Sequence, residues 1–123
     1  MRSSPSFALS TLLSTLLAAG CGSDEGSPPI DPAACQTSYL DYSNFGEPFL
    51  LDWCSGCHSA ALPATMRQMA PAGVDFDTLE NVRRQKERIA ARATGGTPTM
   101  PPAGGPSAEE REMLAEWISC GTK

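Results

Sequence analysis

Two cysteines and a histidine at residues 54–58 form the pattern with the clearest chemical meaning. The run Cys54-Ser55-Gly56-Cys57-His58 has the Cys-x-x-Cys-His spacing that attaches c-type haem. If the run forms a helical turn, side chains at i and i+3 share one face, so both thiols can bond the vinyl groups along one haem edge. The next side chain would bring an imidazole to the iron, and His58 is the only histidine. We therefore predict one covalent haem c at this run.

Three other interpretations of the same residues stay open at this point. A thioredoxin-like Cys-x-x-Cys needs a βαβ context, and the sequence offers no such pattern. A zinc site could combine Cys54, Cys57 and His58 with one distant cysteine. The third interpretation is a chance match in a disulfide-rich exported chain.

The N-terminal segment predicts export. Residues 1–20 have the layout of a signal peptide, with Arg2 near the start, then a leucine-rich stretch and small residues. Ala18-Ala19-Gly20-Cys21 resembles a bacterial lipoprotein processing box, although Ala18 stands where leucine is usual, so we expect Cys21 to carry a lipid anchor. An ordinary signal peptidase site, with a soluble exported product, is the alternative. Export agrees with haem attachment, and disulfides also persist outside the cytoplasm. The expected location is the periplasmic side of a bacterial membrane.

Composition limits both the partners and the size of the core. Without residues 1–20 the chain has 8 basic and 14 acidic side chains, a formal charge of −6, which makes nucleic acid an improbable partner. Residues 21–34 are polar and rich in glycine and proline, as expected of a flexible, lipid-anchored linker. The folded domain is expected over residues 35–123. Aromatic residues make up only 7% of the chain, a thin supply for a core that a buried macrocycle would complete.

Three helices are expected, joined by long loops. The first runs from residue 47 or 48 to residue 58, with Pro48 suited to its first turn. The second starts at an Asp77-Thr78-Leu79-Glu80 capping box and stops at Gly95-Gly96. The third opens with Ser107-Ala108-Glu109-Glu110, buries an apolar stripe and ends at Gly121. Nothing alternates with the period of a strand, so the predicted class is all-α.

The second helix concentrates positive charge. It contains five of the eight basic residues that follow the signal peptide. A docking patch for an acidic partner and a plain solvated helix face are both compatible with this pattern. The five are Arg83, Arg84, Lys86, Arg88 and Arg92.

A sixth iron ligand has to come from a residue other than histidine. Methionine, water or an open site are the choices, and Met66, Met69 and Met100 are the candidates outside the signal peptide and the last helix. Met100 lies in a loop, residues 97–106, that holds four prolines, which restrict the backbone and suit a weak thioether ligand. Met66 and Met69 follow His58 closely, in a segment that must first support the histidine. Packing is the commoner use of any single methionine.

From about residue 35 to 123 the chain resembles a class I cytochrome c. The resemblance is carried by Cys54, Cys57 and His58, by the Met100-Pro101 pair, and by the order of helices and loops. It implies about three main helices around one covalent haem, with the first and last helices crossing. That crossing would bring Trp117 or Leu114 against the helix that contains Leu50 and Trp53.

The resemblance also implies two further features. A carbonyl, that of Pro71 or less favourably Pro63, would accept the Nδ1 proton of His58 and orient the ring. Cys35 and Cys120 would form a disulfide, because the family brings its termini together, and a loop of this length could add about 4 kcal/mol. The alternative is that one of these two cysteines binds zinc. The lysine-rich docking rim of soluble carriers is absent, so no partner surface is indicated.

These features lead to one main functional hypothesis and two alternatives. Methionine opposite histidine leaves no vacant iron position, so the resemblance implies a membrane-tethered electron carrier, not an enzyme, with an unidentified redox protein as partner. A haem enzyme or gas sensor with an open sixth site is the second hypothesis, with Arg67 as its nearest charged group. A structural lipoprotein held by zinc and a disulfide is the third.

Overall fold

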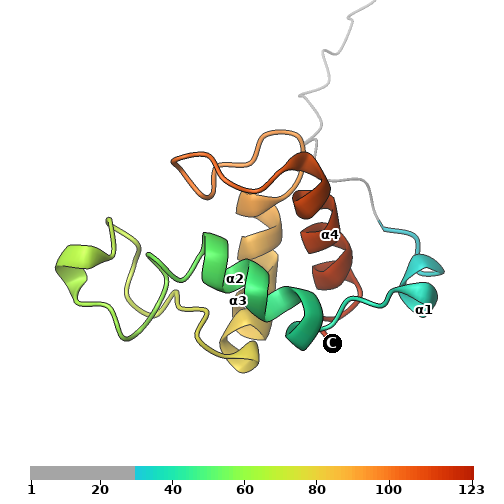
Figure 1. The fold of residues 1–123 in the computed structure, drawn as a ribbon, viewed down its shortest axis with the longest axis horizontal. Helices are drawn as coiled ribbons and strands as arrows, with labels where there is room; N and C mark the ends of the chain where they lie inside the picture. The colour runs from blue at the N-terminus through green and yellow to red at the C-terminus, as the bar shows by residue number, and fades with distance from the viewer. Residues whose placement is uncertain (1–29) are drawn as a thin grey trace, which may run out of the picture.

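The computed structural model describes residues 30–123, which fold into helices joined by long loops, without strands (Figure 1). The predicted all-α class is confirmed for this part of the chain. The expected signal peptide, Cys21 and most of the 21–34 linker lie outside the described residues. The elements are α1 Ala34–Thr37, the π-helix η1 Tyr42–Gly46, α2 Glu47–Trp53, the 3-10 helix η2 Ala64–Met66, α3 Leu79–Ala93 and α4 Ala108–Ser119.

The two longest helices start at side-chain caps. At α4 the Ser107 hydroxyl accepts the Glu110 amide at 3.1 Å and the Glu110 carboxylate accepts the Ser107 amide at 2.7 Å, which confirms the predicted capping box. At α3 the cap is Thr78, so the prediction of Asp77 is wrong by one residue. Asp77 accepts the Ala60 amide at 2.8 Å and thereby fixes the loop before the helix.

The first of the predicted helices is shorter than expected. It was predicted to reach residue 58, but α2 ends at Trp53. The amides of Cys54 and Ser55 both donate to the Leu50 carbonyl, at 2.9 and 2.8 Å, which interrupts the regular i→i−4 ladder. Turns follow, in which the amides of residues 57 and 58 donate to the Cys54 carbonyl. The cysteines therefore sit on a turn just beyond the helix.

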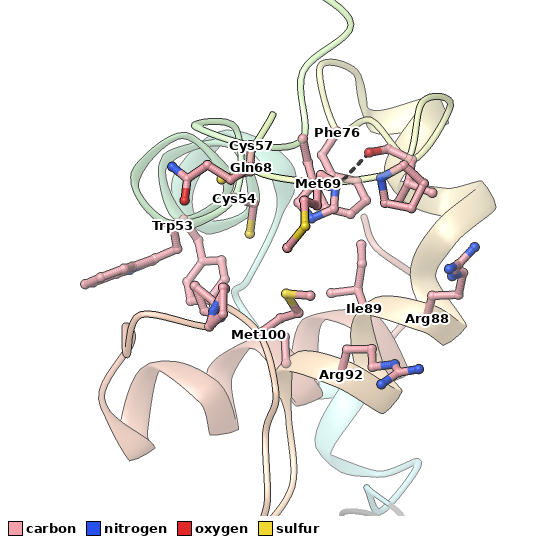
Figure 2. Close-up of a pocket in the computed structure, with 18 residues that line it drawn as sticks. Trp53, Cys54, Cys57, Gln68, Met69, Phe76, Arg88, Ile89, Arg92 and Met100 are labelled. Atoms are coloured by element: carbon pink, nitrogen blue, oxygen red, sulfur yellow. Dashed lines mark hydrogen bonds between the residues drawn. The ribbon is translucent and has the colours of Figure 1, made fainter. Parts of the chain in front are cut away.

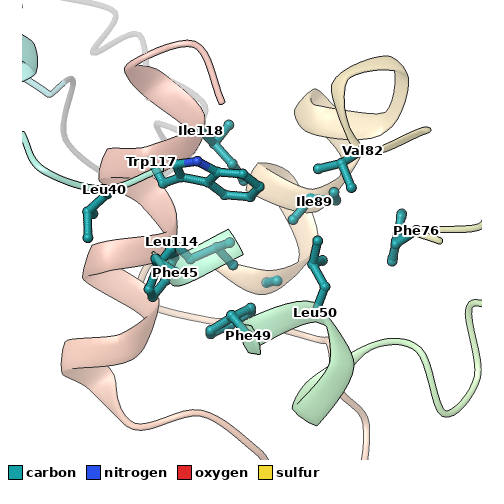
Figure 3. Close-up of a cluster of buried hydrophobic side chains, with 11 residues drawn as sticks. Leu40, Phe45, Phe49, Leu50, Phe76, Val82, Ile89, Leu114, Trp117 and Ile118 are labelled. Carbon is teal, nitrogen blue, oxygen red and sulfur yellow. The ribbon is translucent and has the colours of Figure 1, made fainter. Parts of the chain in front are cut away.

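One hydrophobic core joins α2, α3 and α4 (Figure 3). α3 packs beside α4 and contributes Val82, Ile89 and Ala93 to this core. Trp117 of α4 is 1% exposed, and its ring lies edge-on to Phe45 at a centroid distance of 6.1 Å. Tyr42 stacks on the same indole ring at a centroid distance of 6.4 Å, so two aromatic side chains contact this tryptophan.

Trp117 packs against the backbone of Gly46, the last residue of η1. A Cβ atom at this glycine would lie 2.6 Å from Cη2 of Trp117, well inside van der Waals contact. The indole therefore occupies the space of a side chain, and the close approach of η1 to α4 depends on having no side chain there.

The two ends of the described chain are joined. Cys35 and Cys120 form a disulfide with a Cα–Cα distance of 5.1 Å, which confirms the predicted pair. α1 buries no residue of its own, and besides the disulfide the Lys123 ammonium donates to the Cys35 carbonyl at 3.0 Å. The Tyr42 amide also donates to the Lys123 carbonyl at 2.7 Å. Among residues 30–123, no helix is long and apolar enough to cross a membrane.

Replacing Gly46 with alanine should destabilise the fold, because the new methyl group must displace Trp117. We expect the free energy of unfolding to fall by about 2 kcal/mol, the usual cost of overpacking a core. Denaturant unfolding measures it. The matched control is Gly96→Ala, where an added Cβ meets nothing within 4 Å. Equal effects at both positions would show that the contact with Trp117 is unimportant.

Candidate functional site

A largely apolar cavity of about 460 Å³ opens beside α2 and α3 (Figure 2). It is the place where most of the predicted site residues meet. Cys54, Cys57, His58 and Met100 all line it, and so does Pro71. The rest of the lining comes from the end of α2, the loop after His58, the last turns of α3 and the proline-rich loop; its members are Phe49, Trp53, Gln68, Met69, Ala70, Val74, Phe76, Arg88, Ile89, Arg92, Ala93, Pro101 and Pro102.

Both cavity cysteines are free thiols. Burial raises the pKa of the Cys54 thiol to about 12, although the positive charge of Arg111 acts in the opposite direction. Cys54 is therefore protonated at neutral pH. A thioredoxin-like site needs a cysteine whose pKa is lowered, so the environment of Cys54 disfavours that interpretation.

Within residues 30–123, the zinc interpretation loses its fourth ligand. Cys35 and Cys120 are bonded to each other, so neither can supply a thiolate to the turn at residues 54–58. Within residues 30–123, no group of three or more His, Cys, Asp and Glu side chains is arranged to hold a metal ion. A tetrahedral site of the Cys₃His kind is thus not assembled by these residues.

His58 is oriented by a backbone carbonyl. Its Nδ1 donates to the Val74 carbonyl at 2.8 Å, and its ring stacks on Phe76 at a centroid distance of 4.9 Å. Because a carbonyl oxygen can only accept, Nδ1 carries the proton, and the Nε2 lone pair remains available for a metal ion. The prediction that Pro71 provides this carbonyl is wrong. The Pro71 carbonyl instead accepts from Arg67 Nη2 at 2.8 Å. The carbonyl that accepts from His58 lies three residues later in the chain, at Val74.

Arg67 is the buried centre of the loop that holds His58. The residue is only 6% exposed, and its guanidinium pairs with Asp75 at 2.6 Å. It also shares the Val74 carbonyl with His58, at 3.5 Å. Arg67 does not line the cavity, and its guanidinium is bonded to loop carbonyls and to Asp75. Its other acceptors are the carbonyls of Ser59, Ala70 and Pro71.

The loop that carries Met100 is fixed from two sides. The amides of Thr99 and Met100 both donate to the Arg92 carbonyl, at 2.8 and 2.9 Å. From the other side, Arg111 Nη1 donates to the Met100 carbonyl at 2.8 Å and to the Ala93 carbonyl at 2.7 Å. The proline-rich loop is therefore attached to both α3 and α4.

The three candidate methionines lie in different places. Met66 does not line the cavity, whereas Met69 and Met100 do. Met69 is 97% exposed and has a positive φ of 69°. Met100 is 39% exposed and is thus the less exposed of the two methionines that line the cavity, both of which Figure 2 labels.

The basic residues of α3 divide into two groups. Arg88 and Arg92 line the cavity, and their guanidinium groups lie at the outer edge of that wall (Figure 2). Arg83 instead donates to the Thr122 carbonyl, and Arg84 pairs with Glu80. The α3 helix therefore does not present five equivalent charges to one partner.

Three contributors to the site were not expected from the sequence. Val74 acts through its carbonyl, which every residue type has, so no sequence signal could have identified it. Arg67 was considered only as a distal group, although a lone arginine in an otherwise neutral loop suggests a bond to backbone carbonyls. Arg111 stands among glutamates at the start of α4, where a positive charge opposes the helix dipole. That unfavourable placement is the signal that could have singled it out.

Comparison of the chain with protein-family models, with curated proteins and with solved structures found no match.

Replacing Arg67 with glutamine should unfold the loop that supports His58. The change leaves Asp75 and several carbonyls without their donor, so we expect the free energy of unfolding to fall by about 3 kcal/mol. The control is Arg84→Gln, which breaks an exposed pair and should cost less than about 1 kcal/mol. Denaturant unfolding of both variants provides the comparison. If Arg67→Gln is as stable as Arg84→Gln, the loop does not depend on the buried guanidinium.

Proposed function

We propose that this protein is a single-haem c-type cytochrome that carries electrons, with Cys54 and Cys57 bonded to the haem and His58 and Met100 as axial ligands. One observation carries the proposal: the Cys54-to-His58 run and the distant Met100 line the same apolar cavity. Their convergence would be unexpected if each served only packing.

The residues around the cavity suit a haem group. Both thiols are free for thioether bonds, and the Nε2 lone pair of His58 is available because Nδ1 is committed to Val74. Arg88 and Arg92, at the edge of the α3 wall, supply positive charge suited to two propionates. The apolar remainder of the lining suits the faces of a macrocycle. When bound, the haem would supply a one-electron iron couple whose potential methionine ligation raises.

The protein's own contribution is to hold the ligand side chains in place and to keep water out of the cavity. The Val74 carbonyl fixes the plane of the His58 ring and increases its basicity as a ligand. Phe49, Ile89 and Val74 keep water from the buried part of the cavity. If His58 and Met100 both held the iron, a substrate would have no place to bind it, and no acid or base would be required. Electron transfer is the chemistry that such a site supports.

Replacing Met100 with alanine tests the proposed ligand. The wild-type chain, produced in a host that attaches haem, should be pigmented and carry the mass of one haem. Its oxidised form should show the sulfur-to-iron charge-transfer band at the red end of the visible spectrum, and Met100→Ala should lose this band. Met66→Ala is the matched control, because Met66 does not line the cavity, and it should keep the band.

Other results would direct the function elsewhere. A band that disappears in Met69→Ala and persists in Met100→Ala would move the ligand to the exposed methionine. Rapid binding of carbon monoxide by the reduced wild-type protein would indicate an open site, as in a haem enzyme or gas sensor. A colourless, zinc-loaded protein would contradict the proposal as a whole.

The proposed carrier is tethered to the periplasmic side of a bacterial membrane through Cys21 and exchanges electrons with another redox protein. The support is the signal-peptide layout and the processing box at residues 18–21. We expect the mature protein to partition into detergent and its first peptide to carry diacylglycerol. Cys21→Ala should abolish the lipid, whereas Ser23→Ala should keep it. Mature wild-type protein without lipid would contradict the anchor.

A further inference from the structure

Arg111 occupies the junction of three segments that meet at the cavity. It lies in the first turn of α4, and its Nη1 donates to the carbonyls of Ala93, at the end of α3, and Met100, at 2.7 and 2.8 Å. Its Nε donates to the Pro106 carbonyl at 3.3 Å, near the end of the loop. One guanidinium thus holds the start, the middle and the end of the segment that carries the proposed methionine ligand.

We propose that Arg111 is the positioning residue for the Met100 ligand, holding the loop backbone so that the thioether remains on the iron. The inference rests on the proposed function, in which Met100 is the sixth ligand. Arg111 acts on the methionine through the backbone and makes no contact with the iron itself.

The exposure of Met100 explains why its backbone has to be held. Met100 is 39% exposed, so core packing does not fix its side chain. A thioether is a weak ligand, and a small competing ligand gains whenever the loop moves away. The Thr99 and Met100 amides donate to the Arg92 carbonyl, and Arg111 donates to the Met100 carbonyl. The peptide groups on both sides of the Met100 Cα are therefore held.

The planar fork of arginine suits this junction better than lysine would. A guanidinium offers five N–H groups in a fixed geometry, and Arg111 uses them on three carbonyls, one at the end of α3 and two in the proline-rich loop. A lysine has one ammonium at the end of a flexible stem and can reach only part of this set. Arg111→Lys should therefore hold the Met100 loop less firmly than arginine does, but not lose the hold completely.

Arg83 provides a matched control for a general structural role. It is also an arginine that donates to a backbone carbonyl from a distant part of the chain, through Nε and Nη2 to Thr122 at 3.2 and 2.9 Å. Removing it breaks a tertiary link between α3 and the C-terminal residues. Arg83 does not line the cavity and holds no part of the Met100 loop.

The test uses the full chain with haem attached and imidazole as a competing iron ligand. Spectra measure the imidazole dissociation constant and the temperature at which the sulfur-to-iron band disappears, and denaturant unfolding measures global stability. Arg111→Met should bind imidazole about tenfold more tightly than the wild type, as expected from losing hydrogen bonds made by a charged donor. It should also lose the band at a lower temperature. Arg111→Lys should lie between Arg111→Met and the wild type, and Arg83→Met should match the wild type in imidazole affinity.

Each result separates this inference from the proposed function. A Met100-dependent band with wild-type imidazole affinity in Arg111→Met overturns the positioning role and leaves the function standing. If imidazole affinity increases equally in Arg111→Met and Arg83→Met, Arg111 is only a general structural link, and the positioning role is overturned. A spectrum that Met100→Ala leaves unchanged removes the ligand and the inference together. If Arg111→Met does not accumulate with haem, Arg111→Lys decides, and wild-type imidazole affinity in that variant overturns the proposal.

Discussion

Backbone carbonyls outside the helices need donors, and two arginines provide many of them around the cavity. The loop after His58 and the loop around Met100 have no regular ladder of hydrogen bonds, so their carbonyls depend on side chains. Arg67 serves the first loop from a buried position, and Arg111 serves the second from the start of α4. The bonds to these two guanidinium groups fix the backbone beside His58 and at Met100, both of which line the cavity.

The helices supply the rigid frame for these loops. Trp117 packs directly on the backbone of Gly46, which lets η1 and α4 approach closely. The disulfide between Cys35 and Cys120 then joins the two ends of the domain. With the ends closed and α3 packed beside α4, the remaining freedom lies in the two long loops. The core also forms part of the cavity wall, because Phe49, Phe76 and Ile89 belong to both.

Much of the frame could be predicted from local chemistry. The α4 capping box, the stop of α3 before Gly95 and the apolar stripe of α4 can be predicted because caps and helical periodicity act over a few residues. The same local reasoning failed where a competing bond intervened. The helix before Cys54 ends early because two amides share the Leu50 carbonyl, and Asp77 does not cap α3 because it bonds to Ala60. Neither competing bond can be read from residue types.

By itself, the sequence determined the chemistry that this protein can offer: two cysteines and a single histidine at fixed spacing, a methionine between prolines, and a cysteine pair at the ends of the domain. These follow from residue identity and short spacing along the chain. Only the tertiary structure decided which groups hold them. The carbonyl that orients His58 belongs to Val74, and the guanidinium that holds the Met100 loop belongs to Arg111. Both choices depend on where distant segments meet, because a carbonyl has the same chemistry at every residue and gains its role from position alone.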